Sequence, residues 1–304
     1  MIKKLILIIA LFITTSSFSQ KDRDRFILDS IEPFINNINL TKAEYYKIKK
    51  AIQKIESKNG YEPDYKFRLL SKSYTLGDID FFKKELTILV EKYGFSIAYL
   101  NENESYFNSI TNGDLKEWFK EMYLKKHFVW LQNNFDKQID LKKLNELRTK
   151  DQLINSFASK IINTCNLDSI QKKAELKLLN ESFYSNINDL YNITQKWSAY
   201  PNGKSFAIIQ NNFGVVEFHN NQSKANFNKV WQMFYPYYKK AYKNNEITYM
   251  TFRNHDNFSY LHHGYQEFGL ISIKDIPTEY KKTENEIPIK DINFMNEIKL
   301  ELGW

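Results

Sequence analysis

Apolar residues along most of the chain recur every three or four positions, which is the period of an amphipathic helix. Glycine and proline interrupt helices, and the 304 residues contain only nine and six of them. The pattern predicts a mainly α protein in two parts. A helical-repeat-like module is expected over residues 21–136, and a helix-rich domain over 141–304, with the polar stretch 136–140 between them.

The first part opens with a clear helix signal. Thr41 and Glu44 have the spacing of a capping box, in which a hydroxyl and a carboxyl satisfy the free amides of a helix start. The helix is expected to run to about Ser57 and to stop before Gly60. Two further helices are predicted between Tyr65 and Gly94, with a break at Gly77-Asp78.

The residues at this break and at the end of the second helix, Tyr74-Thr75-Leu76-Gly77-Asp78 and Glu91-Lys92-Tyr93-Gly94-Phe95, resemble a tetratricopeptide-like helical hairpin. One repeat cannot cover its own apolar faces, and arrays usually need three or more units. We therefore expect a short helical array that packs against neighbouring helices. Because such arrays present extended surfaces, the resemblance implies a protein partner.

The second part contains short apolar runs that predict strands. Residues 206–210 and 215–219 flank a loop containing Gly214, which is the pattern of a β-hairpin. Residues 247–252 and 270–273 can add two more strands. The expected class of this part is therefore α+β, helix-rich with a small antiparallel sheet.

A long aromatic helix is predicted from Phe227 to Tyr242, the segment of the chain that is densest in aromatic residues. Its rings recur at helical spacing, so core packing is favoured, and a ligand-binding aromatic box is the alternative. Pro236 lies inside this segment and is expected to kink or divide the helix.

Residues 1–20 have the pattern of a secretory signal peptide. Lys3 and Lys4 precede the apolar run Leu5 to Ile13, and small and polar residues follow up to Gln20. Cleavage is expected after Ser19 or Gln20. The apolar run is about half of the roughly 20 residues that a spanning helix needs. We expect an exported protein, periplasmic or extracellular, with no transmembrane anchor after signal removal.

Charge and cysteine content bear on nucleic-acid binding and on disulfide formation. Removal of the signal takes away two lysines and lowers the net charge from +7 to +5, and the basic residues are spread along the chain. No nucleic-acid partner is predicted from this pattern. Cys165 is the single cysteine, so it cannot form an internal disulfide, and we expect it to be buried.

The densest polar stretch lies between residues 253 and 267. Imidazoles beside a carboxylate suit proton transfer near neutral pH. The candidate catalytic residues are His219, Asp256, His263 and Gln266, with Asp151 as an orienting carboxylate. The sequence leaves three roles open for these residues: structural residues of a loop, a binding cleft, and catalysis. His263, Glu267 and His219 could meet at a metal, but the spacing matches no zinc motif, so no metal or cofactor is predicted.

The C-terminal part resembles a family of bacterial proteins of uncharacterised function. The family pattern has Asp-Gln, then Trp and Pro, Gln-His, Asp-Arg and Gly-x-x-Gln-x-Tyr-Gly-Thr-Gln. The chain offers, in the same order, Asp151-Gln152, Trp197 with Pro201, Phe218-His219, Asp256-Asn257 and Gly264-Tyr265-Gln266-Glu267-Phe268-Gly269. It departs from the pattern at Phe218, Asn257 and Leu270-Ile271.

Two functions follow from these observations. The repeat-like helices and the absence of a complete catalytic motif favour a protein-interaction or binding module. The alternative is a hydrolase, degenerate if the family's polar residues are required, that uses the His, Asp and Gln cluster of the C-terminal domain.

Overall fold

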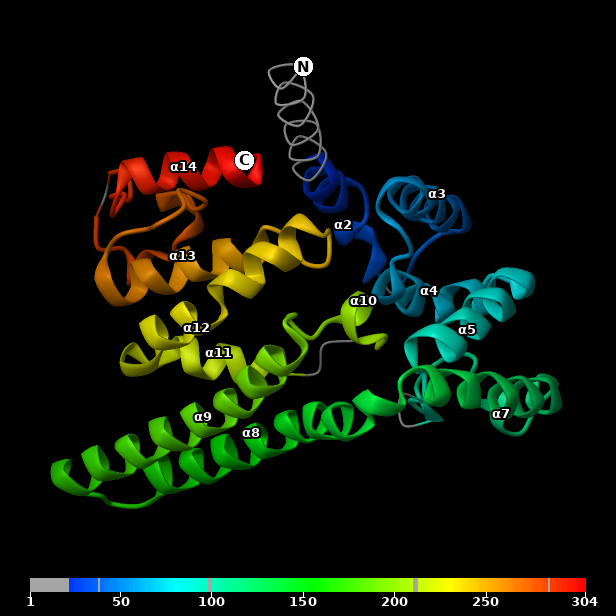
Figure 1. Cartoon of the computed structure of the whole chain (residues 1–304), viewed down its shortest axis with the longest axis horizontal. Coiled ribbons are helices and arrows are strands. Elements are labelled where there is room, and N and C mark those ends of the chain that lie inside the picture. Colours follow the sequence, from blue (N-terminus) through cyan, green and yellow to red (C-terminus); the bar gives the residue numbers. More distant parts are fainter. Residues whose placement is uncertain (1–21, 38, 98–99, 210–212, 284) are drawn as a thin grey trace, which may run out of the picture. The chain divides into compact units, whose positions relative to one another are not determined.

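The computed structural model describes residues 22–37, 39–97, 100–209, 213–283 and 285–304, and for 162–164 it describes the backbone only. The predicted signal peptide and its cleavage site therefore lie outside the described residues. The chain divides into two compact units (Figure 1). The N-terminal unit comprises residues 22–141 and 201–209, and the C-terminal unit comprises 142–200 and 213–304.

The N-terminal unit is built from helices. They are α2 (Glu32–Ile35), α3 (Lys42–Asn59), α4 (Pro63–Thr75), α5 (Ile79–Tyr93), α6 (Phe107–Thr111), α7 (Lys116–Asn133) and α10 (Gly203–Phe206). Helix α3 starts at the predicted capping box, in which Thr41 and Glu44 satisfy each other's backbone amides. Helices α4 and α5 are the predicted pair, and α5 ends where Gly94 adopts a left-handed φ of 63°.

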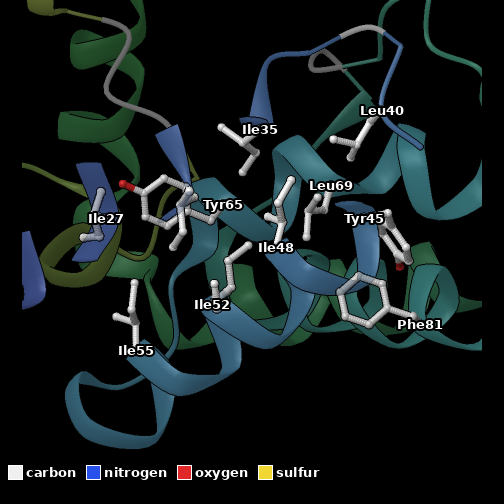
Figure 2. Packing of buried hydrophobic residues seen from close by; sticks show 12 residues of the cluster. Ile27, Ile35, Leu40, Tyr45, Ile48, Ile52, Ile55, Tyr65, Leu69 and Phe81 are labelled. Carbon is white, nitrogen blue, oxygen red and sulfur yellow. The ribbon is translucent and has the colours of Figure 1, made fainter. Parts of the chain in front are cut away.

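Two apolar clusters hold this unit together. The first joins α2, α3 and α4 through side chains such as Ile35, Ile48 and Leu69, all nearly inaccessible to solvent (Figure 2). The second joins α5 to its neighbours through buried rings and aliphatic groups, among them Phe82 and Leu86. Burial of such side chains is the main stabilising contribution.

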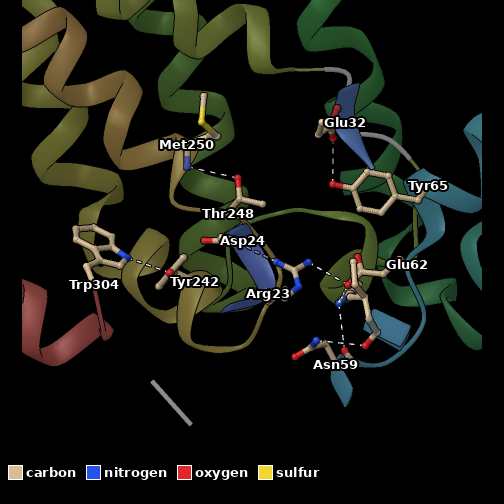
Figure 3. A network of polar contacts seen from close by, with 12 residues as sticks. Arg23, Asp24, Glu32, Asn59, Glu62, Tyr65, Tyr242, Thr248, Met250 and Trp304 are labelled. Carbon is tan, nitrogen blue, oxygen red and sulfur yellow. Dashed lines mark hydrogen bonds and ion pairs between the residues drawn. The ribbon is translucent and has the colours of Figure 1, made fainter. Parts of the chain in front are cut away.

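Residues 201–209 pack with the N-terminal unit, although the sequence analysis assigned them to the C-terminal domain. Phe206 and Ile209 are buried there, and the Trp130 indole donates a hydrogen bond of 2.8 Å to the carbonyl oxygen of Ala207. Arg23 lies 3.0 Å from a Glu62 carboxylate oxygen (Figure 3). Lys204 lies 3.1 Å from the same oxygen. These contacts are distant in sequence, so no local pattern could have shown them.

The C-terminal unit contains most of α8 (Gln138–Thr164), together with α9 (Ser169–Trp197), α11 (Gly214–Gln222), α12 (Lys224–Lys243), α13 (Met250–His263) and α14 (Ile292–Leu302). Helices α8 and α9 run side by side (Figure 1), and the amide of Asn186 donates to the carbonyl oxygen of Leu147 at 3.1 Å. Asp168 caps α9 with Gln171. Cys165, in the connection between α8 and α9, is exposed, so its predicted burial is wrong.

The predicted antiparallel sheet is wrong for the described residues. Within them the structure has no strand, only one isolated parallel bridge between Gln266 and Ile289. The run 215–219 lies inside α11, where Phe213, Val216 and Asn220 are buried at helical spacing. A short apolar run fits a buried strand and a buried helix equally well, and here tertiary packing selects the helix.

The other two expected strands are also absent. Residues 250–252 begin α13, and 270–273 lead into the 3-10 turn Ile273–Asp275. Pro236 lies within α12, which continues through it undivided from Lys224 to Lys243. In the part of the chain that the structure describes, no helix has the length and apolar character that a membrane crossing requires.

Candidate functional site

A cavity of about 180 Å³ lies in the C-terminal unit and is lined by residues of α11, α12 and α13. Its described lining contains one carboxylate, Glu217, and one imidazole, His255. None of the described residues that line it is a lysine or an arginine. The cavity is therefore open to a small ligand and holds a single acidic group.

Glu217 is held by two tyrosines. Its Oε1 accepts hydrogen bonds of 2.7 Å from the hydroxyls of Tyr200, in the segment that follows α9, and of Tyr238 in α12. Burial raises the pKa of the Glu217 carboxyl, and the two tyrosine hydrogen bonds oppose that rise. Glu217 forms no ion pair with any described residue.

Four aromatic side chains line the same cavity. Trp231 and Tyr238 of α12 have ring centroids 5.5 Å apart. Phe218 of α11 and Phe258 of α13 meet edge to face, with centroids 5.8 Å apart. Phe218 is 47% exposed, so one wall of the cavity faces solvent. Rings from three helices thus surround the space beside the carboxyl group.

His255 forms another part of the wall. Its imidazole is stacked between Phe227 and Trp231, at centroid distances of 4.7 and 3.8 Å, and the residue is 2% exposed. Its Nε2 lies 3.3 Å from a carboxylate oxygen of Glu267 without hydrogen-bond alignment, and its Nδ1 has no partner among the described residues. Lys290 contacts the other Glu267 oxygen at 2.7 Å.

The predicted orienting carboxylate lies beside one of the candidate histidines. Oδ2 of Asp151, on α8, is 2.7 Å from Nδ1 of His219, on α11. Asp151 is fully buried, the Phe183 ring packs 4.7 Å from the imidazole, and Asp151 Oδ1 has no partner among the described residues. Burial raises the pKa of Asp151, and the adjacent His219 opposes the rise.

This pairing resembles the His and carboxylate part of an acid–base site. If Nδ1 of His219 carries the proton and donates it to Asp151, then Nε2 is left as a base. That arrangement can serve proton transfer. His219 is not among the residues that line the Glu217 cavity, although its imidazole lies 5.8 Å from the ring of Phe218, which does line it.

The structure gives Asp256 a different setting. Asp256 is fully buried and accepts backbone hydrogen bonds from the amides of Glu267, Phe268 and Leu270, at 2.8, 3.0 and 3.0 Å. Burial raises the pKa of its carboxyl, and these amides oppose the rise. This carboxylate fastens the loop that follows α13.

Gln266 lies in that same loop. Its Oε1 accepts from the amide of Ile271 at 3.1 Å, and its Nε2 donates to the carbonyl oxygen of Ile287 at 3.4 Å. Both ends of the side chain are therefore occupied by backbone groups. Like the contacts of Asp256, these contacts hold loop structure.

His263 stacks on Tyr265 with centroids 5.4 Å apart, and burial lowers the pKa of its imidazole. Helix α13 ends at His263 because Gly264 has a φ of 82°, so His263 and Glu267 do not share a helix face. Among the described residues, no hydrogen bond or ion pair joins His219 to Asp256, His263 or Gln266. Within the same part of the chain, no group of three or more His, Cys, Asp or Glu side chains could hold a metal ion.

The sequence analysis missed the residues around the cavity. Glu217 interrupts the apolar run 215–219, and a carboxylate inside such a run was the signal that could have marked it. Trp231 and Tyr238 lie in the aromatic segment that was interpreted mainly as core. His255 lies in the polar stretch 253–267, but the candidate catalytic residues predicted there were Asp256, His263 and Gln266.

No family model, no curated protein and no solved structure matches this chain. The resemblances noted in the sequence therefore remain predictions, and the functional argument rests on the geometry of the chain itself.

Proposed function

We propose that this protein is a binding protein whose C-terminal unit takes up a compact small molecule in the cavity between α11, α12 and α13. The observation that supports the proposal is the carboxyl group of Glu217, which is half-buried at the cavity and forms no ion pair with any described residue. An unpaired buried carboxylate destabilises a fold. Ligand binding gives a reason for its presence there.

The cavity has the other features of a binding site. It is concave, four aromatic rings line it together with polar side chains, and the Glu217 carboxyl is fixed in place by hydrogen bonds. At about 180 Å³ it is smaller than the cavities that hold drug-sized molecules, which are roughly 300 Å³ or more. A small metabolite is therefore the expected ligand.

The test is a screen of small metabolites of all charge types against the full mature chain, with thermal shift as the first measurement and calorimetry to follow. Binders are expected to lose affinity in Glu217→Gln and to keep it in Glu297→Gln. Glu297 is an exposed residue of α14 that makes no hydrogen bond or ion pair among the described residues. A screen without any binder, or binders equally tight in both variants, would overturn the proposal.

A second candidate function is hydrolysis, and the 2.7 Å contact between Asp151 and His219 favours it. Its test is a panel of hydrolase substrates with and without divalent metal ions. Asp151→Asn should lower any activity by holding His219 in the wrong tautomer, and His219→Ala should abolish it. Activity that survives both substitutions would exclude this mechanism.

Export and a protein partner belong to the same proposal. The signal-like residues 1–20 support a binding site that works outside the cytoplasm, and the helical hairpin of α4 and α5 supports a protein partner for the N-terminal unit. Cell fractionation tests the first, and crosslinking of the exported protein tests the second. A chain that stays in the cytoplasm at full length would refute export.

A further inference from the structure

We infer that the ligand of this cavity is a compact organic cation, an ammonium group with apolar substituents. The inference rests on the proposed binding function and adds the chemical class of the ligand. It follows from the charge balance of the cavity, from the chemistry of its walls and from its size.

The first observation is the charge of the side chains that line the cavity. Among the described residues, Glu217 is the only acidic side chain that lines the cavity, and no lysine or arginine of that part of the chain lines it. Its two hydrogen-bond donors, Tyr200 and Tyr238, are neutral hydroxyls, so the charge of an ionised Glu217 is not balanced by them. A cation that enters the cavity supplies that charge, and an anion would meet a carboxylate with nothing to offset it.

His255 does not supply the missing positive charge. Its Nε2 lies 3.3 Å from Glu267, whose other oxygen contacts Lys290. Any charge on the imidazole is therefore shared with a carboxylate outside the cavity. Its stacking between Phe227 and Trp231 fixes the ring in this orientation.

The walls suit an alkylated cation. The faces of aromatic rings attract cations, most strongly in Trp and Tyr, and this attraction grows when water is excluded. Trp231, Tyr238, Phe218 and Phe258 bring such rings from three helices to one small space. An alkylated ammonium can contact these rings and the Glu217 carboxylate at the same time, because both line the cavity.

Proton release should accompany binding. Burial raises the pKa of Glu217 in the free protein, and a bound cation favours the ionised carboxylate, so cation binding is linked to proton release. The other titratable groups that face Glu217 are Tyr200, Tyr238 and His255. Affinity for a permanently charged cation should therefore rise with pH until Glu217 is fully ionised.

The experiment uses three probes of similar shape and different charge. They are choline, its neutral analogue 3,3-dimethylbutan-1-ol and the anion 3,3-dimethylbutanoate, titrated calorimetrically into the full mature chain. Choline should bind at least tenfold more tightly than the other two, and its affinity should rise between pH 5 and pH 8. Because choline does not titrate in this range, the pH dependence reports on the protein.

Two variants locate the effect. Glu217→Gln keeps an acceptor for both tyrosines and should weaken choline at least tenfold, and it should weaken the neutral probe much less. Phe218→Leu removes a partly exposed ring and should weaken choline several-fold. Phe157→Leu, at a position of α8 that is 62% exposed and outside the cavity, is the matched control and should have no effect.

The outcomes separate this inference from the proposal beneath it. If the neutral or the anionic probe binds as tightly as choline, the ligand class is wrong and the binding function stands. If choline, methylammonium and tetramethylammonium all fail to bind while the wider screen finds a binder, the ligand class is again wrong. If nothing in the wider screen binds either, the proposed function falls as well.

Discussion

Replacing Asp256 is expected to release the loop that follows α13. Its two carboxylate oxygens accept hydrogen bonds from the amides of Glu267, Phe268 and Leu270. Hydrogen bonds to a charged group each stabilise by about 1.5–3 kcal/mol, and they are not additive. The loop can also move so that water reaches its amides. We therefore expect Asp256→Ala to destabilise this loop by about 3–5 kcal/mol, less than the full sum.

Asp256→Asn gives a graded version of the same change. Oδ1 of Asp256 accepts from two of the amides, and Oδ2 accepts from Leu270. The asparagine oxygen can keep the first two contacts, but its NH₂ group then faces the amide of Leu270, donor against donor. The expected loss is about 1–3 kcal/mol, and Leu270 should be the most affected amide.

Hydrogen exchange at these amides is the right assay because it reports local opening. Each 1.4 kcal/mol corresponds to about a tenfold change in exchange rate, so Asp256→Ala should speed exchange by roughly a hundredfold or more. Asn257→Ala, at the next position of α13, is the matched control and should change exchange little. An Asp256→Ala protein with exchange within about twofold of the wild type would refute the loop-fastening role.

Three further outcomes follow from buried charges. Glu217→Gln should raise the Tm at neutral pH, because a carboxyl group with a raised pKa makes the wild type less stable as pH rises through the pKa of the folded state. In acid, where the wild-type carboxyl is protonated, the difference in Tm should vanish. Burial alone would raise the pKa of Glu267, but its His and Lys contacts lower the pKa to about 2. The free energy of unfolding should therefore fall by about 2–3 kcal/mol, reduced by solvent screening, as pH falls from 5 to 2. Urea titrations should show this loss in the wild type and not in Glu267→Gln. Lys66→Ala should cost about 3–5 kcal/mol in urea unfolding, because Glu56 and Glu85, at 3.0 and 3.3 Å, lose their buried partner.

Local signals in the sequence predicted the helices well where they were complete. The capping box of Thr41 and Glu44 starts α3, and the break at Gly77-Asp78 separates α4 from α5. The run 215–219 fits a strand as well as a helix, because five residues are too few to show the period of either. The burial of Val216 on the helical face of α11 comes from packing against other helices, which a short window cannot show.

The candidate site was only partly predictable for the same reason. Asp151 and His219 were both named from the sequence, and their contact spans 68 positions. The sequence does not show the role of Glu217, because its two tyrosines lie 17 and 21 positions away, Tyr200 after the end of α9 and Tyr238 in α12. The character of a carboxylate depends on such partners, so the sequence could suggest residues but could not assign their roles.

Helix α11 carries both candidate functions on opposite sides. Glu217 and His219 are two residues apart, a rotation of roughly 200° around a helix. Their contacts agree with this, since Glu217 meets Tyr238 of α12 and His219 meets Asp151 of α8. The two sites share none of these partners, so substitutions at them should act independently.

We expect the double variant Glu217→Gln, His219→Ala to change the free energy of unfolding by the sum of the single changes, within about 0.5 kcal/mol. Urea unfolding of the four proteins in this cycle, followed by a signal from the C-terminal unit, measures the coupling. Ligand affinity should likewise respond to Glu217→Gln and not to His219→Ala. A coupling of about 1 kcal/mol or more would mean that α11 transmits changes between the two sites, and binding and proton transfer would then have to be treated as parts of one site.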